Sequence, residues 1–246
     1  KGISCPNGAE SIIHMARAFM RDAGNKPRRT IVTLDLTNAF NTPKRQVMAD
    51  IVADFPHLHG IFRAEYGEAA TLRVLRGNDG DTVMSCRGTR QGSAGGALFF
   101  CFALQDVLLH TADTGNATTN AVVVRAYMDD VTIMADSPQD AEAAVGRFAT
   151  MALTRDLEIK NAKCEVWSAV RDGMMPTECA RLRTFNRVKC IKLLGASIAL
   201  TDIDEREHLE ARMQGKYDPF FRRLQLMHGP AATCLLAQCG IPKFGF

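Results

Sequence analysis

The 246-residue sequence lacks several patterns that would place a protein in a class at once. None of its eight cysteines forms a Cys-x-x-Cys pair, and no histidines complete a zinc pattern beside them. We therefore expect neither a disulfide framework nor a cysteine zinc site, and scattered thiols suit a reducing cytosol or nucleus. A signal peptide and an apolar run long enough to span a bilayer are also missing, so no membrane partner is expected.

An excess of charge is lacking as well. With 30 basic and 27 acidic residues the formal net charge is +3, which by itself does not indicate a nucleic-acid binder. The basic residues form short bunches, which are most simply solvated surface: Lys26, Arg28 and Arg29; Lys44 and Arg45; Arg222 and Arg223. The chain also opens without a methionine, so we expect a piece of a longer protein.

What the sequence does contain is 46% hydrophobic residues, enough for a sizeable core, in an alternation of helix and strand patterns. Helical spacing or start signals predict helices over 11–21, from Thr42-Pro43 onward, over 94–109, from Ser137-Pro138 to about 153, and through most of the chain after Asp204. Apolar and β-branched runs predict strands over 30–36, 71–75, 82–86, 121–126, 131–135, 164–169 and 190–199. Because two strand pairs read as hairpins, the fold class is α+β with an antiparallel sheet.

Three aspartates stand at the ends of these strands. Asp35 ends an apolar strand, while Asp129 and Asp130 lie at the turn of an apolar hairpin. Carboxylates hemmed in by buried strands are costly unless cations neutralise them, and oxygen ligands suit Mg²⁺ or Mn²⁺. Two such ions about 4 Å apart can activate a 3′-hydroxyl and stabilise a leaving pyrophosphate. Since aspartate is also common in turns, ordinary turn chemistry is an equal alternative for the Asp129-Asp130 pair alone.

Motifs arranged around these aspartates resemble those of reverse transcriptases, and the resemblance covers nearly the whole chain. In chain order they are 35–40 (DLTNAF, motif A), 90–93 (RQGS, motif B), 127–130 (YMDD, motif C), 157–164 (LEIKNAKC, motif D), 192–195 (KLLG, motif E, the primer grip) and 241–244 (IPKF, the thumb start). The forms of motifs B and D resemble those of non-LTR retrotransposons rather than retroviruses.

The resemblance implies a role for each matching residue. Asp35, Asp129 and Asp130, with the backbone carbonyl of Leu36, would bind two Mg²⁺ or Mn²⁺ ions. Lys163 would give a proton to pyrophosphate, although a merely solvated lysine is the alternative.

Further residues would position the dNTP and the template–primer: Phe40, Arg90, Gln91, Gly92, Tyr127, Met128, Leu194 and Gly195. Phe40 would block a ribose 2′-hydroxyl, or else be a core aromatic residue. Tyr127 and Met128 would pack under primer and template, or simply be apolar hairpin residues.

The resemblance also implies a right-hand polymerase palm, an antiparallel sheet backed by helices, with partial fingers and the start of a helical thumb. The expected parts are a lead-in or partial fingers over 1–30, a palm over 31–203 with a fingers insertion at about 57–90, and the thumb start over 204–246. The partners would be an RNA template, a DNA primer and dNTPs. The expected location is nuclear, within a longer polyprotein that has upstream fingers, with or without an endonuclease.

The sequence departs from the family in two places. Too little chain precedes Asp35 for all the fingers motifs that hold the triphosphate, and Arg28 and Arg29 do not take their place. The stretch 92–96, GSAGG, stands where many relatives have a proline. Two other functions therefore stay open: a catalytically silent, nucleic-acid-binding remnant of such an element, and a telomerase-like palm polymerase with a different template.

Overall fold

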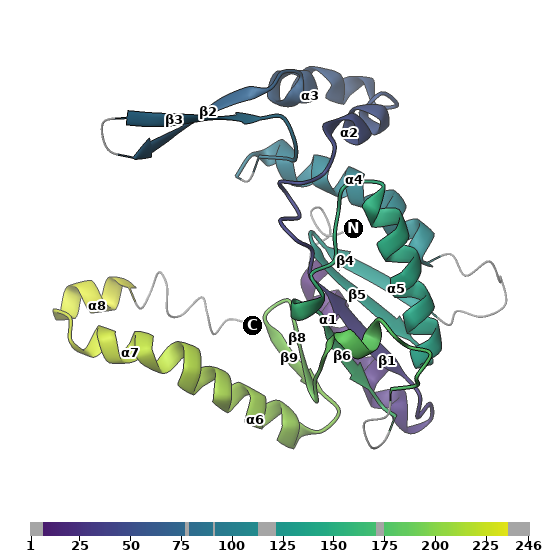
Figure 1. The fold of residues 1–246 in the computed structure, drawn as a ribbon. Coiled ribbons are helices and arrows are strands. Elements are labelled where there is room, and N and C mark those ends of the chain that lie inside the picture. The colour runs from purple at the N-terminus through teal and green to yellow at the C-terminus, as the bar shows by residue number, and fades with distance from the viewer. Residues whose placement is uncertain (1–6, 77–78, 91, 113–121, 171–174, 236–246) are drawn as a thin grey trace.

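The centre of the fold is a five-stranded sheet in the order β4-β5-β1-β6-β7 (Figure 1). The computed structural model describes residues 7–76, 79–90, 92–112, 122–170 and 175–235. The strands are β1 (Thr30–Leu34), β4 (Val122–Tyr127), β5 (Asp130–Ala135), β6 (Glu165–Ser168) and β7 (Asn186–Arg187). Every neighbouring pair is antiparallel except β6 and β7, which are parallel. The predicted α+β class with an antiparallel sheet is confirmed.

Strand β1 lies in the middle of this sheet, between β5 and β6. Its β-branched sequence suits a strand that is covered on both faces. Successive residues point to opposite faces: Val32 and Leu34 join a core cluster with α4 and α5, whereas Ile31 joins a second cluster with α1. All three side chains are almost fully buried, so β1 anchors both layers.

Helices α4 (Ala94–Ala112) and α5 (Pro138–Leu153) cover one face of the sheet (Figure 1). As predicted, Ser137 caps α5, because its hydroxyl accepts the Asp140 N–H at 3.1 Å and a proline follows it. One prediction was wrong: the segment Gly95–Ala112 of α4 is long and apolar enough, by length and composition, to cross a membrane. Phe100 and Leu104 of this helix are buried in the core, and 39% of the segment is buried inside the protein.

The other face is covered by α1 (Gly8–Arg21), which continues into a 3₁₀ turn at Asp22–Gly24, and by a small hairpin. The hairpin consists of β8 (Cys190–Leu193) and β9 (Ala196–Ala199). The prediction of one strand over 190–199 was therefore wrong, because Leu194 and Gly195 both have positive φ angles and reverse the chain.

The segment after β1 leaves the sheet and forms a separate projection. It contains α2 (Arg45–Val52), a 3₁₀ turn at Pro56–Leu58, α3 (His59–Tyr66), and the hairpin of β2 (Ala70–Arg76) and β3 (Asp79–Ser85). This is the predicted hairpin, whereas α2 begins at Arg45 rather than at Pro43.

Arg45 fastens the base of this hairpin. Its guanidinium donates to the carbonyls of Ser85, Arg87 and Gly88 at 2.8, 3.2 and 3.1 Å, and to the Ser85 hydroxyl at 3.0 Å. Burial lowers the pKa of Arg45. Arg45 is thus a structural anchor, which corrects its prediction as solvated surface.

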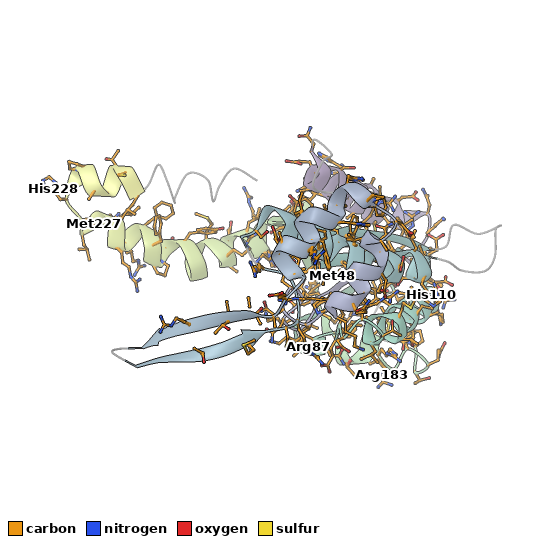
Figure 2. All side chains as sticks on the ribbon, turned by 90° about the horizontal axis from the view of Figure 1, so that it is seen from above. Met48, Arg87, His110, Arg183, Met227 and His228 are labelled. Atoms are coloured by element: carbon orange, nitrogen blue, oxygen red, sulfur yellow. The ribbon has the colours of Figure 1, made fainter. Side chains whose placement is uncertain are left out.

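The chain after the β8–β9 hairpin forms a helical arm, as predicted. The arm contains α6 (Asp202–Arg212), a π-helical turn at Met213–Tyr217, α7 (Asp218–Gln225) and α8 (Gly229–Leu235). The arm and the β2–β3 hairpin project from the same side of the sheet, as two views agree (Figures 1 and 2). The predicted boundaries at 30, 203 and 204 stay predictions, and the IPKF tail lies outside the described residues.

Arg29 joins the helical layer to the sheet. Its guanidinium donates to the Phe19 carbonyl at 2.7 Å and pairs with Asp22 at 2.8 Å and Asp136 at 3.3 Å. It also stacks over the Phe19 ring, 4.2 Å from the ring centroid. Arg29 is buried, so its prediction as solvated surface was wrong.

We predict that Arg29→Ala lowers the free energy of unfolding by about 1–3 kcal/mol, because it removes a buried guanidinium that donates to the Phe19 carbonyl and pairs with Asp22 and Asp136. Urea unfolding measures this loss. Arg28→Ala is the matched control: Arg28 is exposed and its guanidinium donates to the Gln139 side chain, so a change within about 0.5 kcal/mol is expected. Equal losses for the two variants would contradict the assignment.

Candidate functional site

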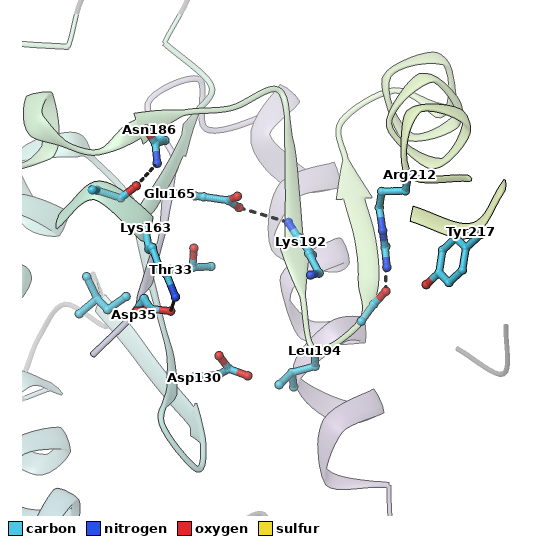
Figure 3. Close-up of a pocket in the computed structure, with 13 residues that line it drawn as sticks. Thr33, Asp35, Asp130, Lys163, Glu165, Asn186, Lys192, Leu194, Arg212 and Tyr217 are labelled. Carbon is cyan, nitrogen blue, oxygen red and sulfur yellow. Dashed lines mark hydrogen bonds and ion pairs between the residues drawn. The ribbon is translucent and has the colours of Figure 1, made fainter. Parts of the chain in front are cut away.

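A cavity of about 760 Å³ opens where β1 ends and β5 begins (Figure 3). Five of the predicted site residues line it: Asp35, Asp130, Lys163, Leu194 and Gly195. Several further lining residues were not predicted from the sequence: Thr33, Glu165, Asn186, Lys192, Arg212 and Tyr217. Lys192 is the first residue of the KLLG motif and could have been predicted from it. Arg212 and Tyr217 belong to the helical arm, and their place at the cavity follows only from the fold.

Asp35 is the first residue beyond β1, and a short bridge holds it there. The Lys160 N–H donates to the Asp35 carbonyl at 2.8 Å, and the Thr37 N–H donates to the Glu158 carbonyl at 2.8 Å. These two bonds flank the Leu36–Ile159 bridge and do not use the Leu36 carbonyl. The Leu36 carbonyl, which the sequence predicts as a metal ligand, is therefore not used by the hydrogen bonds that position Asp35.

Asp129 and Asp130 are placed by the tight turn between β4 and β5. Tyr127 pairs with Asp130, which leaves Met128 and Asp129 as the turn. Met128 has a φ of 56°, a left-handed conformation that costs a residue with a side chain about 1–2 kcal/mol. Such strain is concentrated at functional sites in proteins. The Tyr127 side chain is half-buried against the core cluster that contains α1.

The carboxylates at this edge repel one another. The pKa of Asp130 is raised, first by its partial loss of hydration and then by the negative charges of Asp129 and Asp35, with Lys192 opposing. The Nζ of Lys163 lies 3.8 Å from Oδ2 of Asp35 and supplies a second nearby cation (Figure 3). A set of oxygen ligands with unbalanced negative charge fits a divalent cation.

The same carboxylates do not converge into a complete coordination sphere. In the part of the chain that the structure describes, no three acidic, histidine or cysteine side chains lie closely enough together to hold a metal ion. Asp35 follows β1, while Asp129 and Asp130 share one turn, so the side chains would have to move to bring all three carboxylates onto one cation.

The β8–β9 turn is held against the cavity by two arginines. Arg212 of the helical arm donates to the Gly195 carbonyl at 3.0 Å and to the Ser197 hydroxyl at 3.2 Å. Arg17 of α1 pairs with Glu205 at 2.9 Å and donates to the Ser197 carbonyl at 3.4 Å. The left-handed Leu194 and Gly195 are therefore fixed from both sides.

Phe40 lies beyond Asp35 in the turn that follows Leu36. Its ring stacks on Phe100 of α4 at a centroid distance of 4.4 Å and remains partly exposed. Phe40 does not line the cavity. Both predicted roles for Phe40 remain open, because a ring anchored on the core can also present an edge to a substrate.

The glycine-rich stretch at the start of α4 is closely packed. The Arg90 N–H donates to the Tyr66 hydroxyl at 3.0 Å, and the Ser93 hydroxyl donates to the Glu65 carboxylate at 2.7 Å. A Cβ on Gly96 would lie 2.2 Å from the Arg90 carbonyl oxygen, so only glycine allows this approach. Within this stretch, Gly96 is therefore closely packed, whereas a Cβ on Gly92 would meet nothing within 4 Å.

Gly92 and Gln91 complete this predicted group. Gly92 is exposed, with a φ of 86°, and Gln91 lies outside the described residues. Arg90, Gly92, Phe40, Tyr127 and Met128 do not line the cavity, and neither do Asp129 and Leu36. Tyr127 and Met128 nevertheless share the β4–β5 turn with Asp129 and Asp130.

An antiparallel sheet that presents carboxylates at a strand end and a hairpin turn, with helices behind it, defines the palm class of nucleotidyl-transferring polymerases. The family model described as "Reverse transcriptase (RNA-dependent DNA polymerase)" matches residues 9–198. The chain therefore belongs to the reverse transcriptase family.

One solved structure supports the same fold. The chain is similar to apo telomerase from Candida tropicalis truncated from its C-terminal domain, with a TM-score of 0.54 and 9% identity over 81% of this chain. A telomerase from Candida albicans in complex with a fragment of telomeric RNA matches with a TM-score of 0.47 and 9% identity over 85%. This chain spans only 39% and 38% of those two chains. No curated protein matches the sequence.

We predict that Asp130→Asn raises the melting temperature, measured without divalent cations at pH 7, by about 1–2 °C. The raised pKa means that ionised Asp130 is disfavoured in the folded state. The parent therefore loses stability as the pH rises through this pKa, and neutralisation restores it. Below about pH 4 the gain should vanish, since the parent carboxyl is then protonated. Asp54→Asn, at an exposed carboxylate, is the control, and a lower melting temperature for Asp130→Asn would refute the repulsion.

We predict that Gly96→Ala costs about 2–3 kcal/mol of folding free energy, because the added Cβ collides with the Arg90 backbone. Gly146→Ala is the matched control, since Gly146 lies inside α5 with nothing within 4 Å of an added Cβ. This control should stabilise the protein by about 0.5–1 kcal/mol. Chemical denaturation measures the free energy of unfolding of both variants. If both substitutions change it in the same direction, the expected collision at Gly96 is contradicted.

Proposed function

We propose that this chain carries out RNA-templated DNA synthesis, joining the α-phosphate of a dNTP to the 3′-hydroxyl of a DNA primer. The observation that carries the proposal is the placement of three carboxylates at one edge of a reverse transcriptase fold: Asp35 directly after β1, and Asp129 and Asp130 at the β4–β5 turn. Structural stability alone does not favour three like charges at this place.

Asp35, Asp129, Asp130 and the Leu36 carbonyl would hold two Mg²⁺ or Mn²⁺ ions, which when bound activate the 3′-hydroxyl and neutralise charge on the leaving pyrophosphate. The chain's own residues then mainly orient the reactants, because phosphoryl transfer depends on positioning and charge neutralisation. Lys163, beside Asp35, would release its carboxylate partner to the cations and give a proton to a pyrophosphate oxygen.

The remaining predicted residues would position the nucleic acid and the nucleotide. The β8–β9 turn at Leu194 and Gly195, fixed by Arg212, would support the primer strand next to the cavity. Arg90, Gln91 and Gly92 would contact the template and the incoming nucleotide. Phe40 would exclude a ribose 2′-hydroxyl, and Tyr127 with Met128 would underlie the primer terminus.

We further propose that the chain comes from a non-LTR retrotransposon, acts in the nucleus, and belongs to a longer polyprotein. The support is the arginine-glutamine form of motif B and the motif D pattern around Lys163. The fold likeness to telomerase favours a second candidate, a telomerase-like polymerase that copies a dedicated RNA. Template choice separates the two: a retrotransposon enzyme extends primers on unrelated RNA, whereas the second candidate requires its own template.

The deciding test is extension of a labelled DNA primer on an RNA template with Mg²⁺ or Mn²⁺. We predict extension by the parent and a loss of at least about a hundredfold in Asp129→Asn, since a metal ligand supports several kcal/mol of transition-state stabilisation. Asp54→Asn, remote and exposed, should retain full activity.

Two results would count against the proposal. Equal extension by the parent and Asp129→Asn would exclude the metal site. A folded parent that holds the duplex but extends no primer, even with upstream fingers sequence restored, would identify the silent nucleic-acid-binding remnant.

A further inference from the structure

The backbone N–H of Asp35 needs a hydrogen-bond partner that the sheet does not provide. The pairing of β1 with β6 ends at Thr33 and Glu165. Beyond this pair the β6 side departs from extended geometry, because Asn161–Lys163 form a 3₁₀ turn. A strand end next to a cavity would then leave the Asp35 N–H unpaired, which is costly in a partly buried position.

The side chain of Cys164 occupies the place of the missing backbone acceptor. The Asp35 N–H donates to the Cys164 Sγ at 3.4 Å. The thiol in turn donates to the Lys160 carbonyl at 3.5 Å. Cys164 is 0% exposed, and its Sγ also lies 4.0 Å from the Asp35 carbonyl oxygen.

Three hydrogen bonds join Asp35, Cys164 and Lys160 in a closed ring next to the candidate site. The Lys160 N–H donates to the Asp35 carbonyl at 2.8 Å, and the two sulfur contacts complete the circuit through Cys164. The same 3₁₀ turn ends at Lys163, whose ammonium lies 3.8 Å from the Asp35 carboxylate. One thiol therefore ties the segment that carries Asp35 to the segment that carries Lys163.

We propose that Cys164 is a positioning residue: its sulfur replaces a backbone carbonyl at the end of β1 and fixes Asp35 relative to Lys163. The consequence for catalysis rests on the proposed function, whereas the hydrogen bond to the Asp35 N–H does not. The two claims can therefore be tested separately.

The first measurement is amide hydrogen exchange at Asp35 in the parent, Cys164→Ala, Cys164→Ser and Cys179→Ala. Cys179 is the matched control, because it is also 0% exposed and lies in the same core cluster. The amide of Val32, in the middle of β1, corrects for changes in global stability. Relative to Val32, Asp35 should exchange at least about fivefold faster in Cys164→Ala. It should stay within about twofold of the parent in Cys164→Ser and Cys179→Ala, because serine restores an acceptor.

The second measurement is primer extension at varied Mg²⁺ and dNTP concentrations. Cys164→Ala should lower kcat about tenfold and raise the Mg²⁺ concentration for half-maximal rate, with little change in the KM for dNTP. Cys164→Ser should recover most of the rate. Cys179→Ala should lose comparable stability yet keep the parent kcat and Mg²⁺ dependence per folded molecule.

The outcomes distinguish the two claims. Equal exchange at Asp35 in Cys164→Ala and Cys179→Ala would overturn the positioning role. Faster exchange at Asp35 in a protein whose parent extends no primer would uphold the hydrogen bond and defeat only the proposed function. Faster exchange with unchanged kcat and Mg²⁺ dependence would overturn the catalytic consequence of the positioning.

Discussion

The like charges of Asp35, directly after β1, and of Asp129 and Asp130, at the β4–β5 turn, are the constraint on which the candidate site depends. The pKa of Asp130 is raised, first by its partial loss of hydration and then by the negative charges of Asp129 and Asp35. A sheet buried on both faces gives them a rigid base, since β1 pairs with β5 and β6 and anchors both core clusters. A divalent cation bound at this edge would offset these negative charges, so the raised pKa of Asp130 and the proposed chemistry have one origin.

Arginine side chains hold together backbone segments that are far apart in the sequence. Arg45 fastens the base of the projecting hairpin, and Arg212 ties the helical arm to the β8–β9 turn. Guanidinium groups suit this task because each presents several donors in a fixed plane. The projecting hairpin and the arm lie on the same side of the sheet (Figures 1 and 2), and an arginine holds the base of each.

Local signals in the sequence predicted β1, the YMDD hairpin and α5 well, because β-branched runs, a tight turn and a Ser-Pro cap each act within a few residues. The β8–β9 hairpin was missed because leucine, rather than glycine or asparagine, takes the first left-handed position of its turn. Arg29, Arg45 and Arg212 could not be assigned from sequence, since their partners become neighbours only after folding. Cys164 stands at the end of motif D, but its contact with Asp35 spans 129 positions and leaves no periodic trace.

The most direct test of the central claim is a count of bound Mn²⁺ by electron paramagnetic resonance. The sample would hold the chain with an RNA template, a primer that lacks its 3′-hydroxyl, and the matching dNTP, so that no reaction follows binding. The account predicts two tightly bound ions per chain in the parent and a loss of tight binding in Asp35→Asn. A parent that binds no more Mn²⁺ than Asp35→Asn would contradict the claim that these carboxylates form a cation site.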